Sequence, residues 1–102
     1  MKIIARLSDD IERKIEQAEC DIKTALELKD EFPTLAETYF KIASQELADM
    51  GVLHTHVASI IEDYKKKKGD PPEGMKLLYE ILHKKHIQHT ATVKSMLSLY
   101  KE

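Results

Sequence analysis

Two stretches decide the fold: Glu31-Phe32-Pro33-Thr34-Leu35-Ala36-Glu37 and Gly69-Asp70-Pro71-Pro72-Glu73. Both contain helix-breaking residues, namely Pro33 in the first and Gly69, Pro71 and Pro72 in the second. In the first stretch, Thr34 is a predicted N-cap, and Glu37 at the third helical position completes a capping box. We therefore expect one helix to end near the start of this stretch and another to begin directly after Thr34.

The second stretch also predicts the end of one helix and the start of the next, with different residues. Gly69 suits the left-handed residue that closes a helix. Asp70 is the predicted N-cap of the next helix, Pro71 its first helical residue, and Glu73 completes another capping box. The chain is thereby divided into three segments.

Few breakers interrupt these segments. The 102 residues include three glycines and three prolines, too few for the turns of an all-β fold. We predict a single all-α domain, residues 1–102, in which three long helices form an antiparallel bundle. Their expected ranges are about residues 8–30, 35–67 and 71–99, the first starting near Ser8 or earlier.

Composition excludes several classes of protein. The length excludes a multidomain enzyme. No run of 18 apolar residues predicts a membrane span. The first residues lack the charged-then-apolar pattern of a signal peptide, so we do not expect a secreted protein. The net charge of -2, with alternating signs, does not predict a nucleic-acid partner, and Lys65 to Lys68 are expected to end a helix. A single cysteine, Cys20, cannot form an internal disulfide, so we expect a cytoplasmic protein.

Apolar residues recur at helical spacing in all three segments and predict the core. Because three helices of this length bury little at their middle, we expect a homodimer that completes a larger bundle. The predicted core residues are Ile4, Ile11, Ile15, Ala18, Ile22, Ala25 and Leu26 in the first segment; Leu35, Tyr39, Ile42, Met50, Leu53, Val57, Ile60, Ile61 and Tyr64 in the second; and Met75, Leu78, Tyr79, Leu82, Val93, Met96, Leu97 and Tyr100 in the third.

Acidic residues interrupt the apolar face of the second helix. Glu46 falls at its centre and Asp49 on its flank. A lone buried carboxylate is costly, so it must be paired, metal-bound or neutral. In an antiparallel hairpin, Glu19 comes level with Glu46, and Glu16 comes level with Asp49 while pointing further towards solvent or a partner subunit. A cation between facing acids would remove their repulsion.

The third helix supplies imidazoles. His86 and His89 lie inside its apolar stripe, and His83 lies at the border. His89 is predicted within a turn of Asp49, and His86 level with His54. Carboxylate and imidazole ligands suit iron, manganese or zinc, and bundle proteins build di-metal sites from such residues on facing helices.

On these residues the chain resembles the ferritin-like superfamily, in particular its short rubrerythrin-like, encapsulated-ferritin-like and phage-associated members. The resemblance covers about the first 60 residues and is carried by Ile15-Glu16-Gln17-Ala18-Glu19 and by the stretch from Ala36 to His54 that contains Glu46-Leu47-Ala48-Asp49. It implies an iron-binding protein with ferroxidase-like chemistry, in which Glu19 (or Glu16) is the first metal ligand and Glu46 the second. Asp49 stands where the family has histidine, so His89 or His54 supplies the missing nitrogen, or the site has become a scaffold.

Other interpretations stay open. Glu46 could be held by a buried ion pair with Lys94, and Asp49 could be partly exposed at the edge of the bundle. A non-catalytic, oligomeric helical adaptor without a cofactor is the main alternative function. Leu82-His83-Lys84-Lys85-His86 also resembles the phosphorylated segment of the lactose-type phosphotransferase IIA subunits, although the His-x-x-Asp-His spacing of that family is absent. His56 and Cys20 are expected at the surface.

Overall fold

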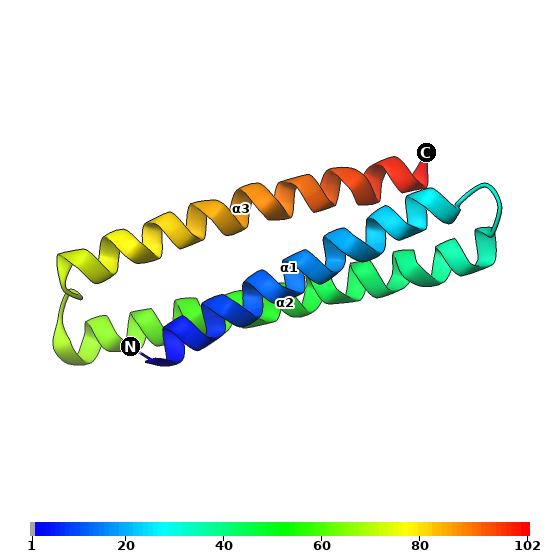
Figure 1. Cartoon of the computed structure of the whole chain (residues 1–102). Coiled ribbons are helices and arrows are strands. Elements are labelled where there is room, and N and C mark those ends of the chain that lie inside the picture. Colours follow the sequence, from blue (N-terminus) through cyan, green and yellow to red (C-terminus); the bar gives the residue numbers. More distant parts are fainter. Residues whose placement is uncertain (1) are drawn as a thin grey trace.

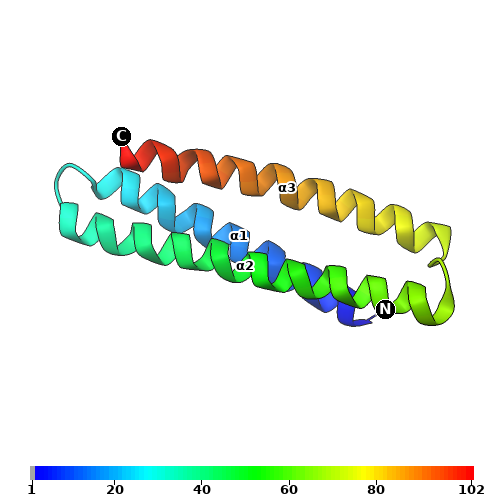
Figure 2. The same cartoon turned by 180° about the vertical axis from the view of Figure 1, so that it is seen from behind.

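The computed structural model describes residues 2–102, apart from the side chain of Met75, and contains three helices and no strand in that range. Helix α1 spans Lys2–Leu28, α2 spans Pro33–Lys68 and α3 spans Glu73–Lys101. The chain reverses direction at each connection (Figures 1 and 2). The predicted all-α class is therefore confirmed, and the helices form a rod of 56 × 19 × 17 Å. The predicted core position Met75 lies outside the described side chains.

The start of α2 corrects the first predicted cap. The helix begins at Pro33, with Phe32 in the N-cap position and no side-chain cap. Thr34 therefore lies inside the first turn, and the Thr34–Glu37 capping box is wrong. The physical reason is that proline has no N–H to satisfy and its φ is already helical, so the helix can begin there without a capping side chain.

The third helix also begins later than predicted. Helix α3 begins at Glu73 with Pro72 in the N-cap position, so Asp70 as N-cap and Pro71 as first helical residue are wrong. A residue that precedes proline is disfavoured in the helical region, so Pro71, which precedes Pro72, is a poor first residue for the helix. Gly69 was predicted correctly: it closes α2 with a φ of +78°.

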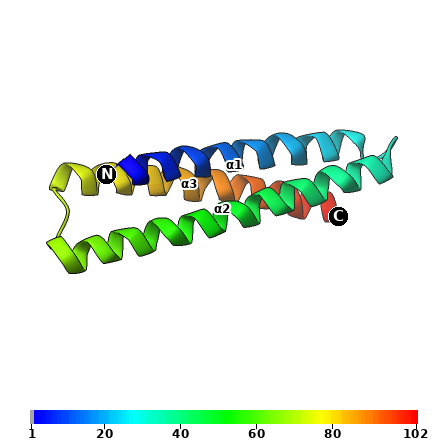
Figure 3. The same cartoon turned by 90° about the horizontal axis from the view of Figure 1, so that it is seen from below.

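Helix α1 lies at the centre of the packing. Its buried stripe recurs at intervals of three and four residues, as the predicted core requires: Ile11, Ile15, Ala18, Ile22 and Ala25. Helices α2 and α3 both pack against α1 but contact each other much less, and Figure 3 shows the three rods from below. The side of the bundle between α2 and α3 is consequently the open one.

The buried face of α2 differs from the predicted one. Its buried residues are Ala36, Ala43, Leu47, Met50 and Val57. At about 100° per residue, this face is rotated by roughly 60° from the predicted centre. Leu35 and Ile42, predicted as core, are 47% and 43% exposed, and Leu78 of α3 is 58% exposed. The prediction is wrong for these three residues because the buried face of α2 is rotated away from Leu35 and Ile42, and Leu78 lies outside the buried face of α3.

No helix within residues 2–102 is both long and apolar enough to cross a membrane.

Candidate functional site

The polar residues of α1 lie on two flanks of its buried stripe. At about 100° per residue, Glu12 and Glu19 project from one flank, and Lys14 and Asp21 project from the other. The first flank faces α3 and the second faces α2. Glu19 and Glu46, predicted at one level, are therefore directed to different neighbours.

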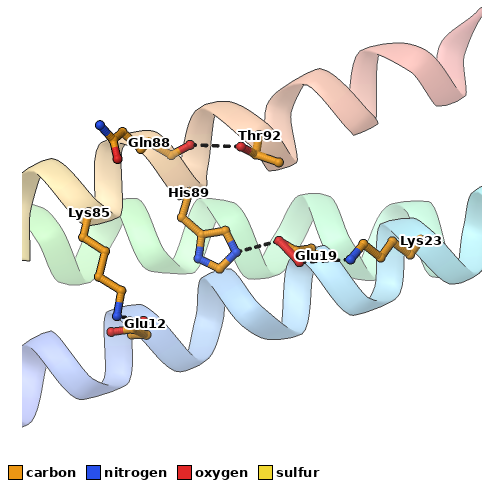
Figure 4. A network of polar contacts seen from close by, with 7 residues as sticks. All are labelled: Glu12, Glu19, Lys23, Lys85, Gln88, His89 and Thr92. Atoms are coloured by element: carbon orange, nitrogen blue, oxygen red, sulfur yellow. Dashed lines mark hydrogen bonds and ion pairs between the residues drawn. The ribbon is translucent and has the colours of Figure 1, made fainter.

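Glu19 of α1 and His89 of α3, both predicted metal ligands, are in direct contact. The His89 Nε2 and Glu19 Oε2 atoms are 2.7 Å apart, and Lys23 Nζ donates to Glu19 Oε1 at 3.1 Å (Figure 4). The hydrogen bond from His89 lowers the pKa of Glu19, and the bond from Lys23 adds to this effect. Both oxygens of this carboxylate are thus engaged by protein groups, which ties α1 to α3.

A second ion pair lies on the same flank (Figure 4). Lys85 Nζ is 2.6 Å from Glu12 Oε1, and its hydrogen bond lowers the pKa of Glu12. His86 Nε2 stands 4.0 Å from the other Glu12 oxygen, beyond hydrogen-bond distance. His86 is 6% exposed and this nitrogen has no partner. Burial lowers the pKa of His86, so the ring is neutral at pH 7.

Glu46 of α2 faces the other flank of α1, where it lies beside Asp21. Its Oε2 atom is buried and has no hydrogen-bond partner. Burial, followed by the neighbouring Asp21 carboxyl group, raises the pKa of Glu46 to about 7, while Lys14 opposes the shift. The folded chain therefore retains the Glu46 proton to a higher pH than an ordinary glutamate does. A raised carboxyl pKa of this kind is typical of acids that share a confined space.

The remaining predicted acids are placed separately. Asp49 accepts a hydrogen bond from Gln45 at 2.9 Å and is partly exposed. Glu16 is exposed, as expected for its outward direction. Lys94, the alternative ion-pair partner of Glu46, makes no ion pair with it in the part of the chain that the structure describes. That interpretation is wrong because Lys94 instead borders the open side between α2 and α3.

The histidines gather on this open side. His54 Nε2 of α2 and His83 Nδ1 of α3 are 2.9 Å apart. Next to them is a cavity of about 320 Å³ whose lining includes Met50, Gly51, His54 and His86. Burial lowers the pKa of His54, and the neighbouring His83 adds to this effect. No neighbouring segment of the described chain comes within 4 Å of where a Cβ of Gly51 would be.

Sequence reasoning missed Asp21 and His83 as partners within the site. Asp21 lies two residues after Glu19 but on the opposite flank of α1. Which flank each residue occupies can be assigned only when the centre of the buried stripe is known. His83 was placed at the border of its stripe, and His54 was assigned to the level of His86. His56 and Cys20 are exposed as predicted.

Across residues 2–102, no three Cys, His, Asp or Glu side chains are grouped closely enough to hold a metal ion as they stand. Two of the predicted ligands, Glu19 and His89, instead contact each other as a pair. In comparisons with known proteins, no family model matches the chain, and no match was found among curated proteins or among solved structures.

Proposed function

We propose that the chain is a helical-bundle protein that acts by association, an oligomeric adaptor or structural protein that pairs with a second copy of itself through α3. The observation that carries this proposal is an apolar patch formed by Leu77, Leu78 and Ile81, which are 58%, 58% and 56% exposed. Ile81 lies four positions after Leu77 and three after Leu78, so it neighbours both of these adjacent leucines on one side of the helix. Exposed apolar patches of this kind mark interaction surfaces.

A two-fold contact suits the charges around this patch. In an antiparallel pairing of two α3 helices, the patch covers itself, because both copies use the same residues. The pairing also brings the acidic start of α3, at Glu73, towards Lys84 across the interface. Burying a leucine or isoleucine side chain contributes about 1.5–3 kcal/mol, so several such residues stabilise a dimer measurably.

Light scattering and analytical ultracentrifugation test the proposal. We expect the native chain to be a dimer and the double variant Leu77→Ser/Ile81→Ser to dissociate at least about 100-fold more readily, since about 1.4 kcal/mol is tenfold. The matched control is Val52→Ser on α2, because Val52 is also 58% exposed but lies outside the patch. A native chain that stays monomeric at about 0.1 mM, above the dissociation constants of specific dimers, would contradict the proposal.

Metal binding, which the ferritin-like resemblance implies, is the second candidate. One observation favours it: Glu46 has a buried, unpartnered oxygen beside Asp21, with Asp49 one turn further along α2. Carboxylate oxygens suit hard ions such as Fe²⁺ or Mn²⁺. Glu46, Asp21 and Asp49 would hold the ion after a side-chain rotation, whereas Glu19 is already engaged by His89. Such an ion would supply redox or Lewis-acid chemistry.

Metal content separates this candidate from the first. Untagged protein is reconstituted with ferrous iron and assayed as the native chain, as Glu46→Ala and as Glu16→Ala. The metal candidate requires iron in the native chain and in Glu16→Ala, and its loss in Glu46→Ala. Equal, near-zero iron in all three contradicts it and leaves the association proposal in place.

A further inference from the structure

The contact between His54 and His83 joins α2 to α3 through two ring nitrogens. His54 Nε2 and His83 Nδ1 are 2.9 Å apart, whereas the ring centroids are 4.8 Å apart and the planes are inclined by 22°. The two rings are nearly parallel, and they come closest through these two nitrogen atoms. The lone pairs of imidazole nitrogens lie in the ring plane, so both are directed at the space between them.

One proton occupies that space in the neutral pair. One nitrogen donates and the other accepts, so a hydrogen bond forms only while one ring carries its proton there. Burial and the neighbouring ring lower the pKa of His54, which keeps this imidazole neutral at pH 7. Neutral imidazole is the form in which histidine binds metal ions.

The spacing is close to that of two metal ligands. In a tetrahedral zinc site with Zn–N distances of about 2.0–2.1 Å, two ligand nitrogens are about 3.3 Å apart. A small rotation of either ring opens the present 2.9 Å contact to that distance. Replacing the shared proton with a metal ion would then satisfy both lone pairs at once.

The surroundings hold the two rings and leave room beside them. Tyr79 lies against His83, with ring centroids 5.7 Å apart and planes inclined by 17°. The cavity of about 320 Å³ is lined by His54 and His86, and it can hold water ligands of an ion bound at His54. His86 is buried, and its unpartnered Nε2 is a further nitrogen near this cavity.

We propose that His54 and His83 form a binding site for a divalent transition-metal ion of nitrogen preference, zinc or copper, which bridges α2 and α3 and leaves coordination positions open to the cavity. The site is independent of the association patch and of Glu46. It uses nitrogen donors, which zinc and copper prefer, whereas Glu46 and Asp21 offer oxygen. Metal binding would link α2 to α3 on the open side of the bundle, where these two helices have few contacts.

Isothermal titration calorimetry of the untagged chain with ZnCl₂ tests the site. The variants are His54→Gln and His83→Gln, and the matched control is His56→Gln, because His56 is on the same helix but exposed. We expect one zinc ion per chain in the native protein and in the control. Both site variants should bind at least about tenfold more weakly, since even the loss of an outer-shell partner costs that much.

A second measurement guards against a folding defect in the variants. Nitrogen-15 NMR of the native chain should show that zinc shifts the His54 and His83 ring nitrogens and leaves those of His56 unchanged. Equal affinity in native protein and His83→Gln, or equal loss in His56→Gln, would overturn the proposal. So would the absence of zinc-induced shifts at His54 and His83. Glu46→Gln should retain zinc binding, which separates this site from the carboxylate candidate.

Discussion

Replacing Glu46 with glutamine should stabilise the protein in neutral and alkaline solution and leave it unchanged in acid. The carboxyl group has a pKa of about 7 in the folded chain, against an ordinary value of 4.5. As pH rises between these values, the unfolded chain releases the Glu46 proton while the folded chain retains it. Folded-state stability therefore falls across this window and is constant above it.

The magnitude follows from the same two values. Each pH unit between them corresponds to about 1.36 kcal/mol, so the full difference is about 3 kcal/mol. Because Glu46 is only partly buried, solvent screens its charge, and we expect about 2 kcal/mol. Glutamine has nearly the same shape and carries no charge beside Asp21.

Urea unfolding followed by far-ultraviolet circular dichroism measures this effect. The quantity to plot is the difference in unfolding free energy between Glu46→Gln and the native chain, because contributions from the histidines and other acids largely cancel in it. It should be near zero at pH 4.5, rise towards about pH 7 and remain level above. Glu16→Gln, a change at an exposed acid, is the control and should show no such rise. A flat difference for Glu46→Gln, or a less stable variant above pH 7, would refute the reasoning.

Three further predictions concern the fold. Glu19→Gln should lose about 1 kcal/mol of unfolding free energy, because it weakens the 2.7 Å contact with His89. Since the pKa of Glu19 is lowered in the folded chain, this loss should be present above pH 4.5 and fade in acid. Urea titrations across pH measure it. Gly51→Ala, at an exposed position in the middle of α2, should stabilise the fold by about 1 kcal/mol. Gly69→Ala should destabilise it by about 1 kcal/mol because the φ of Gly69 is +78°. The melting temperatures of the two variants should therefore shift in opposite directions. Ile22→Ala should cost about 3 kcal/mol because Ile22 is fully buried, and a urea midpoint that stays at the native value would contradict its place in the core.

The number and approximate ranges of the helices were predictable because glycine and proline are so unevenly placed. The orientation of α2 was not. Its buried face begins at Ala36 and Ala43, whose small side chains contribute little to a hydrophobic pattern, while the large residues Leu35 and Ile42 are exposed. Small residues are buried where backbones come close, and only the arrangement of neighbouring helices reveals those places.

The candidate site was predictable to the same degree. The register of the hairpins placed Glu19 level with Glu46, and His89 near Asp49. Neither the pairing of Glu19 with His89 nor the partner of Glu46 followed from it, because register fixes the height of a residue and leaves its direction undetermined. Asp21 and Glu19 differ little in height along α1, yet they face different helices. The contact of His54 with His83 escaped prediction for a similar reason, since α2 is rotated from its expected orientation.

The unequal packing of the three helices has a consequence for how the native protein opens. Helix α1 contacts both neighbours, while α2 and α3 contact each other little. Detachment of α3 then breaks its contacts with α1 and leaves the α1–α2 hairpin intact. Amide protons of α3 should accordingly exchange with solvent through a partial opening of lower free energy than global unfolding, and those of α1 should exchange last. The third helix would thus be a separate cooperative unit, which the chain can release and recapture without losing its core.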